Sequence, residues 1–409
     1  MGLRALNKNI VYLFLVQFFN YIGPLLVIPF LTRIFTIEEF GLFSVYSSII
    51  VFAFVITDLG FNLACTNLIA KKNSEADVNS INKISTSALI AKAIVLKVLL
   101  LICITIALVS SKVGFLQVLA IYFPIAMQAF FLNWFFQGIE KMKGVTATFA
   151  ASKCLYLVLV VLFINPSSTV YHVFFFLGVS NFIAAIVSIY IARANQFRFV
   201  LVTKKDVLDL ILYSLNFFFS RLAVSIYTSI NTVVIGYFTS LPQAALFGAV
   251  EKVYQGVQSL TSPISQALYP FLSRTKNRKA FFKYLLLSSI PLLFFLIIVA
   301  FNSKFLILLL FGEAYVDSFN VLNVFLICSL ITFLSVNFGY PAFSLLGRLD
   351  IANKTTYLGL LTQIFGLLYC LLFNIELNAL NVVTLVLITE VSVLLIRLFF
   401  FITLSRGSK

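Results

Sequence analysis

Long apolar runs separated by short polar connections dominate the chain. Twelve of these runs reach about 20 residues, the length that a helix needs to cross roughly 30 Å of hydrocarbon. Their centres lie near Phe19, Phe52, Val98, Pro124, Leu155, Asn181, Ala223, Ser259, Leu292, Thr332, Gly366 and Leu394. This pattern predicts an all-α integral membrane protein with twelve transmembrane helices.

Two landmarks in the first half of the chain return in the second half. Phe40-Gly41 in TIEEFGLFSVYSS is matched by Phe247-Gly248, and Gly138 in WFFQGIEKMKG is matched by Gly347 in FSLLGRLDIAN. The chain therefore divides into two tandem copies, residues 1–200 and 201–409, each predicted to form a six-helix lobe. Because six is an even number, both copies enter the membrane in the same direction, and the repeat is of the parallel kind.

The composition agrees with lipid as the main solvent of this chain. Of its 409 residues 61% are hydrophobic and only 11% are charged, far fewer charges than a soluble surface needs. The five cysteines lie in or beside apolar runs and form no CxxC pair, so neither a disulfide framework nor a metal site is predicted. The first apolar run has no small-residue cleavage site, and we expect it to be retained as a helix.

The basic residues predict the orientation. With the N-terminus in the cytoplasm, the inside segments carry 20 Lys and Arg residues, and the outside loops carry only Arg33, Lys112 and Lys304. Because basic residues stay on the cytoplasmic side of short loops, both termini are predicted to be cytoplasmic. The net charge of +15 then needs no nucleic acid partner, since the basic loops lie on an anionic membrane surface.

Sequence motifs exclude several function classes. The chain has neither GxxxxGK[ST] nor a GxGxxG followed by a βαβ pattern, which excludes an ATP-driven pump acting alone. Its only histidine is His172, and its loops are short, whereas a membrane glycosyltransferase is expected to carry a large loop with catalytic groups. We therefore predict a protein that is not an enzyme and that holds no cofactor.

Arg221 is the most informative ionisable residue at membrane depth, where a charge costs at least ~2.5–3.5 kcal/mol. Ser225, Thr228 and Thr232 share its helical face, and this polar stripe predicts a hydrated cavity. In that setting Arg221 can meet an anionic ligand. The alternative is a structural pair or a hydrogen bond between helices.

Two further polar stripes extend the predicted cavity, which we place between the two lobes. The stripe on the eighth predicted helix contains Glu251, Gln255 and Gln258, with Lys252 beside it. In the first helix Gln17 and Asn20 lie three residues apart, before Gly23-Pro24. Together with Arg221, Ser225 and Thr228, these residues and Lys97 of the third helix form the predicted substrate-binding surface: Lys252, Lys97, Gln17, Asn20, Gln255 and Gln258.

The remaining membrane-depth charges leave two interpretations open each. Lys92 is expected to snorkel to the surface, whereas Lys97 lies deeper and either lines the cavity or serves packing. Asp58, near the end of the second run, either binds a coupling cation or proton, or caps a helix and pairs with Lys71 or Lys72.

Acidic residues at membrane depth are the candidates for ion coupling. They are Asp58, Glu251 and Glu390. Glu390 and Arg397 lie seven residues apart on one helical face, too far for direct contact, so packing against a neighbouring helix is the alternative role for both.

Two segments carry a family resemblance. PFLTRIFTIEEFGLFSVYSSIIVFAFVITDLGF and NWFFQGIEKMKG, with the tandem twelve-run pattern, resemble the polysaccharide-transporter branch of the multidrug/oligosaccharidyl-lipid/polysaccharide flippase superfamily. Within that branch the chain is most similar to the O-antigen flippases called Wzx. The resemblance covers nearly the whole chain, and its most specific motif is PxLxRxxxxxxFG followed by DLGF.

The resemblance implies a substrate and a mechanism. The substrate is an undecaprenyl-diphosphate-linked oligosaccharide, moved from the cytoplasmic to the periplasmic leaflet of the bacterial inner membrane. A V-shaped pair of lobes moves it by alternating access, coupled to a gradient of H⁺ or Na⁺. Other polysaccharide-assembly membrane proteins are the partners compatible with this role.

Two other functions stay open. A multidrug or cation antiporter of the same superfamily would want an acidic cavity, which Asp58, Glu251 and Glu390 keep in consideration and which Arg221 argues against. A membrane-embedded polysaccharide polymerase or ligase would turn over glycosidic bonds.

Overall fold

The structure is helical throughout the part of the chain that it describes. It is a computed structural model, and it describes residues 15, 18, 23, 26–109 and 114–407. These residues contain helices and connections but no β-strand. The prediction of an all-α fold is confirmed.

The helices follow one another with short connections. In chain order they are α2 (Ile37–Asp58), α3 (Phe61–Ser74), α4 (Val78–Val109), α5 (Phe115–Ala129), α6 (Asn133–Gly138), α7 (Met142–Phe163), α8 (Val170–Ala194), α9 (Lys204–Ser229), α10 (Asn231–Phe238), α11 (Leu241–Thr275), α12 (Arg278–Phe301), α13 (Ser303–Phe311), the 3₁₀ helix η1 (Glu313–Ser318), α14 (Phe319–Asn337), α15 (Tyr340–Leu346), α16 (Leu349–Leu372) and α17 (Ala379–Gly407).

Ten helical segments among the described residues are long and apolar enough to cross a membrane, as expected of a multi-pass membrane protein. They contain ten of the twelve predicted centres. The run around Phe19 lies mostly outside the described residues. The run around Ser259 lies in α11, which has 35 residues but carries too many polar side chains to be counted as a span by apolarity. The count of twelve therefore stays a prediction.

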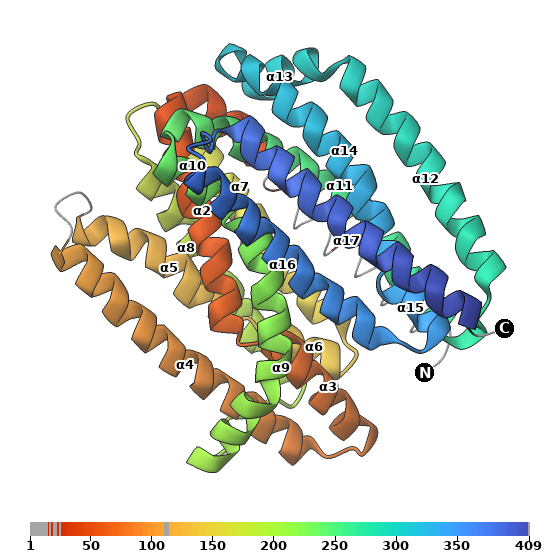
Figure 1. Cartoon of the computed structure of the whole chain (residues 1–409). Helices are drawn as coiled ribbons and strands as arrows, with labels where there is room; N and C mark the ends of the chain where they lie inside the picture. Colours follow the sequence, from red (N-terminus) through yellow and green to blue (C-terminus); the bar gives the residue numbers. More distant parts are fainter. Residues whose placement is uncertain (1–14, 16–17, 19–22, 24–25, 110–113, 408–409) are drawn as a thin grey trace. The chain divides into compact units, whose positions relative to one another are not determined.

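The chain forms two compact units, and two helices contribute to both of them. One unit contains Ile49–Leu222 with the described residues before Ile28, and the other contains Ile28–Ser48 and the chain from Ala223 onward. Within the first unit α8 packs against α5 and α7, and within the second α17 packs against α14 and α16 (Figure 1). The repeat predicts a boundary between the two copies near residue 200. The two compact units are defined by contacts and not by the repeat, so this boundary stays a prediction.

The second landmark of the repeat has the same local structure in both copies. In the first unit α5 is followed by the short helix α6 and then by α7. In the second unit α14, the short α15 and α16 follow in the same way, with α6 and α15 beginning at Asn133 and Tyr340. Gly138 ends α6, and Gly347, with a φ of 68°, follows α15. Each copy thus breaks a long helix before this glycine.

The DLGF motif breaks the helical run between α2 and α3. Leu59 and Gly60 have φ values of 47° and 77°, a left-handed conformation that ends α2 at Asp58. At Gly60 there is also no room for a side chain, because a Cβ would lie 2.7 Å from the backbone nitrogen of Phe218 on α9. Glycine is therefore required here both by φ and by the close approach of α9.

In the second unit the start of α2 approaches α10 and α11 closely through small residues. A Cβ on Gly41 would lie 2.0 Å from the carbonyl oxygen of Leu241, and a Cβ on Gly248 would lie 2.6 Å from Ser44. Small residues of this kind let membrane helices pack backbone against backbone. The repeated Phe-Gly pair thus places glycine from both copies of the repeat at one helix crossing.

In the first unit, segments predicted to lie on one side of the membrane meet at one end. Lys83 in α4 forms an ion pair of 2.9 Å with Asp206 in the first turn of α9. One residue earlier, Asn82 donates a hydrogen bond of 3.2 Å to the carbonyl oxygen of Gln196 after α8. The connections before α4 and before α9 therefore share one end, as the predicted orientation requires. Which side of the membrane this end faces stays a prediction.

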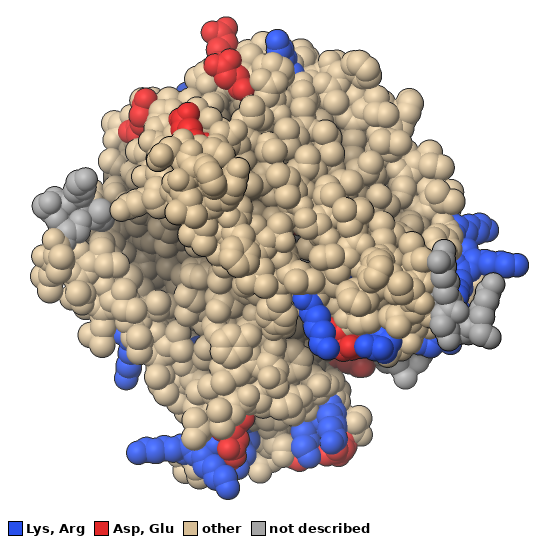
Figure 2. Space-filling view, viewed as in Figure 1, with Lys and Arg blue, Asp and Glu red and all other residues tan. Residues whose placement is uncertain are grey.

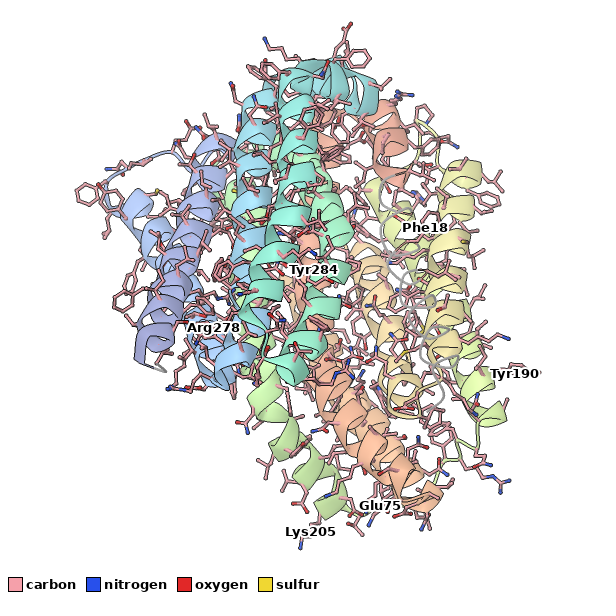
Figure 3. All side chains as sticks on the ribbon, turned by 90° about the vertical axis from the view of Figure 1, so that its right-hand side faces the viewer. Phe18, Glu75, Tyr190, Lys205, Arg278 and Tyr284 are labelled. Carbon is pink, nitrogen blue, oxygen red and sulfur yellow. The ribbon has the colours of Figure 1, made fainter. Side chains whose placement is uncertain are left out.

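Charged side chains lie mainly at the margins of the face shown in Figure 2, most of which is uncharged. Figure 3 labels Glu75 and Lys205 at the bottom, the end of the first unit where α3 ends and α9 begins. Such a distribution is expected of helices whose middle parts lie in hydrocarbon.

Candidate functional site

A polar cavity lies inside the first unit, where the DLGF motif separates α2 from α3 and where α5 ends before the NWFFQG segment of α6. Its volume is about 110 Å³, and its walls come from the ends of α2 and α5, the starts of α3 and α6, and the middle parts of α4 and α9. Its polar and charged lining residues are Thr57, Asp58, Asn62, Lys92, Gln128, Asn133 and Arg221.

Asp58 lies between two cations in this cavity. Its Oδ1 is 3.6 Å from Nζ of Lys92, and its Oδ2 is 3.4 Å from Nη1 of Arg221. The sum of these three charges is positive, because two cations face one carboxylate. A cavity with a net positive charge favours an anionic ligand over a cationic one.

Local sequence explains how Asp58 reaches this position. The left-handed residues Leu59 and Gly60 end α2 at Asp58 and turn the chain into α3. The Asp58 carboxylate then accepts a hydrogen bond of 3.4 Å from the backbone N–H of Asn62 in the first turn of α3. A carboxylate at a helix N-terminus also interacts favourably with the helix dipole.

The two cations differ in accessibility. The Lys92 side chain is 5% exposed and that of Asp58 is 9% exposed, whereas the Arg221 side chain is 40% exposed. Lys92 therefore serves mainly to balance the buried carboxylate. Arg221 can keep Asp58 on one side of its planar guanidinium and present its remaining N–H donors to a second anion.

Two buried oxygen atoms in the cavity have no hydrogen-bond donor among the described residues. They are Oδ1 of Asp58, which faces Lys92 only at ion-pair distance, and Oδ1 of Asn133. Buried oxygen atoms without a donor are costly, at about 1–3 kcal/mol each. Water or the hydroxyl groups of a ligand can supply the missing donors.

The predicted partner of Asp58 is wrong. Asp58 pairs with Lys92 and Arg221 and not with Lys71 or Lys72. Lys72 instead forms an ion pair of 2.7 Å with Glu75, three residues further along. The reason is the turn at Gly60, which directs the Asp58 carboxylate into the unit and away from the far end of α3.

The structure contradicts the role expected for Lys92, whereas the role of Lys97 in a cavity between the lobes stays a prediction. Lys92 was expected to snorkel, but it is buried and paired with Asp58. Lys97 is exposed and is not among the residues that line the cavity. Five residues of α-helix turn the side chain by about 140°, so the two lysines cannot share one face.

Replacing Lys92 with methionine is expected to destabilise the protein by roughly 3–5 kcal/mol, because the carboxylate of Asp58 loses its buried partner. The same replacement at exposed Lys97 is expected to change stability by less than about 0.5 kcal/mol. Thermal unfolding of both purified variants in detergent measures the difference. The double replacement of Lys92 by methionine and Asp58 by asparagine should recover part of the loss. Equal unfolding temperatures for the two lysine variants would contradict the assignment.

The second unit contains other predicted substrate-binding residues. Buried Glu251 accepts a hydrogen bond of 3.3 Å from Thr232, and half-buried Lys252 donates one of 3.2 Å to Gln255. Ser225 is buried and its hydroxyl group has no partner among the described residues, whereas exposed Thr228 donates to the carbonyl oxygen of Val224.

Three other predicted substrate-binding residues are not assigned to a cavity by the structure. Gln258 is half-buried on α11. Gln17 and Asn20 lie outside the described residues. Membership of the predicted binding surface stays a prediction for all three.

Glu390 and Arg397 pack against neighbouring helices. Arg397 on α17 donates hydrogen bonds of 3.0 Å to Thr355 on α16 and of 2.8 Å to the carbonyl oxygen of Ser335 on α14. Glu390 is buried, at 8% exposure. The contacts of Arg397 thus support its structural interpretation, while an ion-coupling role of Glu390 stays a prediction.

Sequence reasoning missed five of the seven polar and charged lining residues: Thr57, Asn62, Lys92, Gln128 and Asn133. Gln128 and Asn133 flank the break between α5 and α6, and Lys92 was assigned to the surface. Asn133 is the first residue of the NWFFQG segment, which follows the break between α5 and α6. A polar residue at such a break in an apolar run is the feature of the sequence that could have indicated this part of the site. Nothing in the periodicity of α4, which is apolar on most of its circumference, indicates which of its lysines lies inside.

Three comparisons extend these observations. Residues 6–276 match the family described as "Polysaccharide biosynthesis protein". A Shigella dysenteriae protein named "Putative O-antigen transporter" is 30% identical over 280 residues, which cover 66% of this chain and 68% of the relative. The alignment thus spans about two thirds of either chain.

Solved structures with a similar fold have little sequence identity to this chain. An inward-facing multidrug resistance MATE family transporter of the MOP superfamily superimposes with a TM-score of 0.75, at 13% identity and over 96% of either chain. The lipid II flippase MurJ, in an inward closed conformation, gives a TM-score of 0.68 at 12% identity, over 97% of this chain and 90% of MurJ. At this identity the likeness concerns the fold alone.

Proposed function

This chain belongs to the polysaccharide biosynthesis protein family, and from that premise we propose that it is a flippase for a lipid-linked oligosaccharide. The substrate is an undecaprenyl-diphosphate-linked repeat unit, such as that of an O-antigen, which moves from the cytoplasmic to the periplasmic leaflet of the inner membrane. The relative named as an O-antigen transporter supports the sugar class, and the fold shared with a lipid II flippase supports the mode of transport.

The observation that carries the proposal is the charge of the cavity around Asp58. Lys92 and Arg221 outnumber the carboxylate, and Arg221 is the cation left partly exposed. A diphosphate needs such donors, because phosphate oxygens form strong charge-assisted hydrogen bonds with guanidinium groups. A cationic drug would meet repulsion in the same place.

The chemistry of the substrate explains why a polar path is required. A sugar diphosphate is strongly hydrated, and its transfer into hydrocarbon without hydrogen-bond partners is prohibitive. Arg221 can hold the phosphates while the unpartnered oxygen atoms of Asp58 and Asn133 accept hydrogen bonds from sugar hydroxyl groups. The apolar tail can stay in the bilayer throughout.

The direction of transport agrees with the membrane potential. An inside-negative potential favours outward movement of an anion by ~2.3 kcal/mol per charge and 100 mV. Cations that travel with the headgroup would cancel part of this gain. We propose that Arg221 and Lys92 stay fixed while the protein alternates between states open to either side.

We further propose that a buried carboxylate of the second unit couples transport to a proton gradient. Glu251 and Glu390 are both less than 10% exposed, and ionisable groups buried in membrane helices commonly take part in proton relays. Asp58 is the weaker candidate, because two cations already hold its charge.

Replacing Glu251 or Glu390 with glutamine is expected to remove most of the stimulation of transport by a pH gradient, because an amide cannot carry the proton. Transport of lipid-linked sugar in membrane vesicles, with and without the gradient, measures this effect. Glu376→Gln, at an exposed position between α16 and α17, serves as the control. An unchanged response in both test variants would rule out the two carboxylates, and a response to sodium alone would rule out proton coupling.

Gene deletion with plasmid complementation tests the proposed function. We expect loss of surface polysaccharide and accumulation of intact lipid-linked repeat units on the cytoplasmic leaflet, both reversed by the plasmid copy. Single repeat units that reach the periplasm without being joined would instead indicate a polymerase. Unchanged pools of both species would leave a drug exporter as the function to test.

A further inference from the structure

A wide apolar groove lies beside α12 in the second unit, far larger than the polar cavity of the first. It has a volume of about 460 Å³, within the ~300–1,000 Å³ range of small-molecule sites. Phe282 from α12 and Leu398, Phe401 and Ile402 from α17 form its sides, with Phe338 between them. Phe282 and Ile402 are 44% and 48% exposed, so the groove is accessible at these two side chains.

An aromatic cluster makes the floor of this groove rigid. The rings of Phe338 and Phe401 are 5.6 Å apart, and Phe281 lies 5.4 Å from Phe338 and 5.9 Å from Phe401. Phe281, Phe338 and Phe401 are all less than 10% exposed. A preformed apolar trough of this kind can take a flexible hydrocarbon chain without rearrangement.

One end of the groove is cationic. Arg278, in the first turn of α12, lines it and donates a hydrogen bond of 3.4 Å to the carbonyl oxygen of Ser405 in the last turn of α17. Figure 3 labels Arg278. The groove therefore combines an apolar trough with a guanidinium group at its end, which is the layout of an amphiphile with an anionic head.

The connection around Arg278 is strongly basic. Between residues 253 and 312 the chain has no Asp or Glu, and its basic residues before α12 enters its apolar part are Arg274, Lys276, Arg278, Lys279 and Lys283. Figure 2 shows Lys and Arg side chains gathered at the margin where α12 begins. Four to eight basic residues beside a membrane helix are typical of anionic-lipid binding.

We propose that the groove between α12 and α17 binds an acyl chain of an anionic phospholipid, whose phosphate Arg278 and its basic neighbours hold. The groove flanks helices that are apolar enough to cross a membrane, so lipid chains are the molecules that reach it. The charge of the lipid headgroup determines which lipid binds, because the basic segment attracts an anionic headgroup and has no net attraction for a zwitterionic one. This site is separate from the transport cavity around Asp58.

Native mass spectrometry of the purified full chain tests the proposal. In equimolar phosphatidylglycerol and phosphatidylcholine, the wild-type protein is expected to retain phosphatidylglycerol at least about fivefold better, the preference that one basic residue provides at a membrane surface. Arg278→Gln should lower this preference, and Arg278→Lys should keep most of it. Ile402→Trp, which fills the groove and changes no charge, should lower the number of retained phosphatidylglycerol molecules.

The control is Lys354→Gln on α16, a basic side chain of the same unit that is 78% exposed and does not line the groove. It should leave the preference unchanged. Thermal unfolding in detergent checks that each variant is folded, and Lys279→Gln with Lys283→Gln provides a second charge test at exposed positions.

Three outcomes would overturn the proposal. They are an unchanged preference in Arg278→Gln, unchanged lipid retention in Ile402→Trp, and displacement of phosphatidylglycerol by an equimolar polyprenyl phosphate. The last outcome would assign the groove to the carrier of the transported sugar. Loss of transport in Arg221 variants with normal lipid retention would leave the groove proposal intact.

Discussion

Alanine in place of Arg221 is expected to lower surface polysaccharide at least tenfold while the protein remains in the membrane. Hydrogen bonds to charged groups contribute about 1.5–3 kcal/mol each, and every 1.4 kcal/mol is a factor of ten in affinity. The replacement also leaves Lys92 as the only cation beside Asp58, so the cavity loses its net positive charge. Immunoblotting of membranes and gel analysis of surface polysaccharide measure both quantities.

Two matched variants sharpen this test. Arg221→Lys keeps the charge but loses the planar set of donors, so part of the activity should remain. Arg193→Ala removes an exposed arginine at the end of α8 and should have no effect. Normal polysaccharide in Arg221→Ala cells would show that this cation has no part in transport.

Alanine at Gly41 is expected to prevent accumulation of the folded protein. The new Cβ would lie 2.0 Å from the carbonyl oxygen of Leu241 and 2.6 Å from its carbonyl carbon. Because these are backbone atoms, the clash can be relieved only if the backbone of one of the two helices moves. Separating α2 from the start of α11 would forfeit the contacts of Phe40, a fully buried ring, and we expect a loss of more than about 4 kcal/mol. The yield of monodisperse protein after mild heating in detergent measures the effect.

The partner position offers a rescue that tests the same helix crossing. Gly248→Ala would place a Cβ 2.6 Å from Cβ and Oγ of Ser44, and Ser44→Gly would remove both of these atoms. The double variant should therefore be more stable than Gly248→Ala alone. Gly114→Ala is the control, because its Cβ would meet only the Gln117 side chain at 3.7 Å. If Gly41→Ala and Gly114→Ala gave equal yields, the close approach would be disproved.

Much of the fold follows from the sequence for a simple physical reason. In hydrocarbon every backbone N–H and C=O must be paired within its own segment, so a run of about 20 apolar residues predicts a helix whatever its neighbours are. Ten of the predicted spans are found as such among the described residues, and the second repeated landmark has the same helix breaks in both copies. The predicted run around Ser259 lies in α11, a helix of 35 residues whose polar stripe makes it less apolar than the ten spans.

The candidate site was only half predictable. Asp58 and Arg221 stand out in sequence because charges are rare at membrane depth, and the structure brings these two together from positions 163 residues apart. Lys92 was misplaced because a helix that is apolar on most of its circumference does not reveal which face turns inward. Asn133 was not predicted as a site residue, because a single uncharged polar residue at a helix break forms no periodic polar stripe along a helix.

The amino-acid sequence alone predicts a helical membrane protein with a repeated unit and a few charges within its apolar runs. Each of these properties depends only on the residues within one segment and on the lipid or water that surrounds it. The packing of the helices was needed to show that Lys92 and Arg221 contact Asp58, that Lys97 does not line the polar cavity around Asp58, and that Gly41 lies against a carbonyl group. These are properties of pairs of helices, and the order of residues along one helix does not specify the face against which another helix packs.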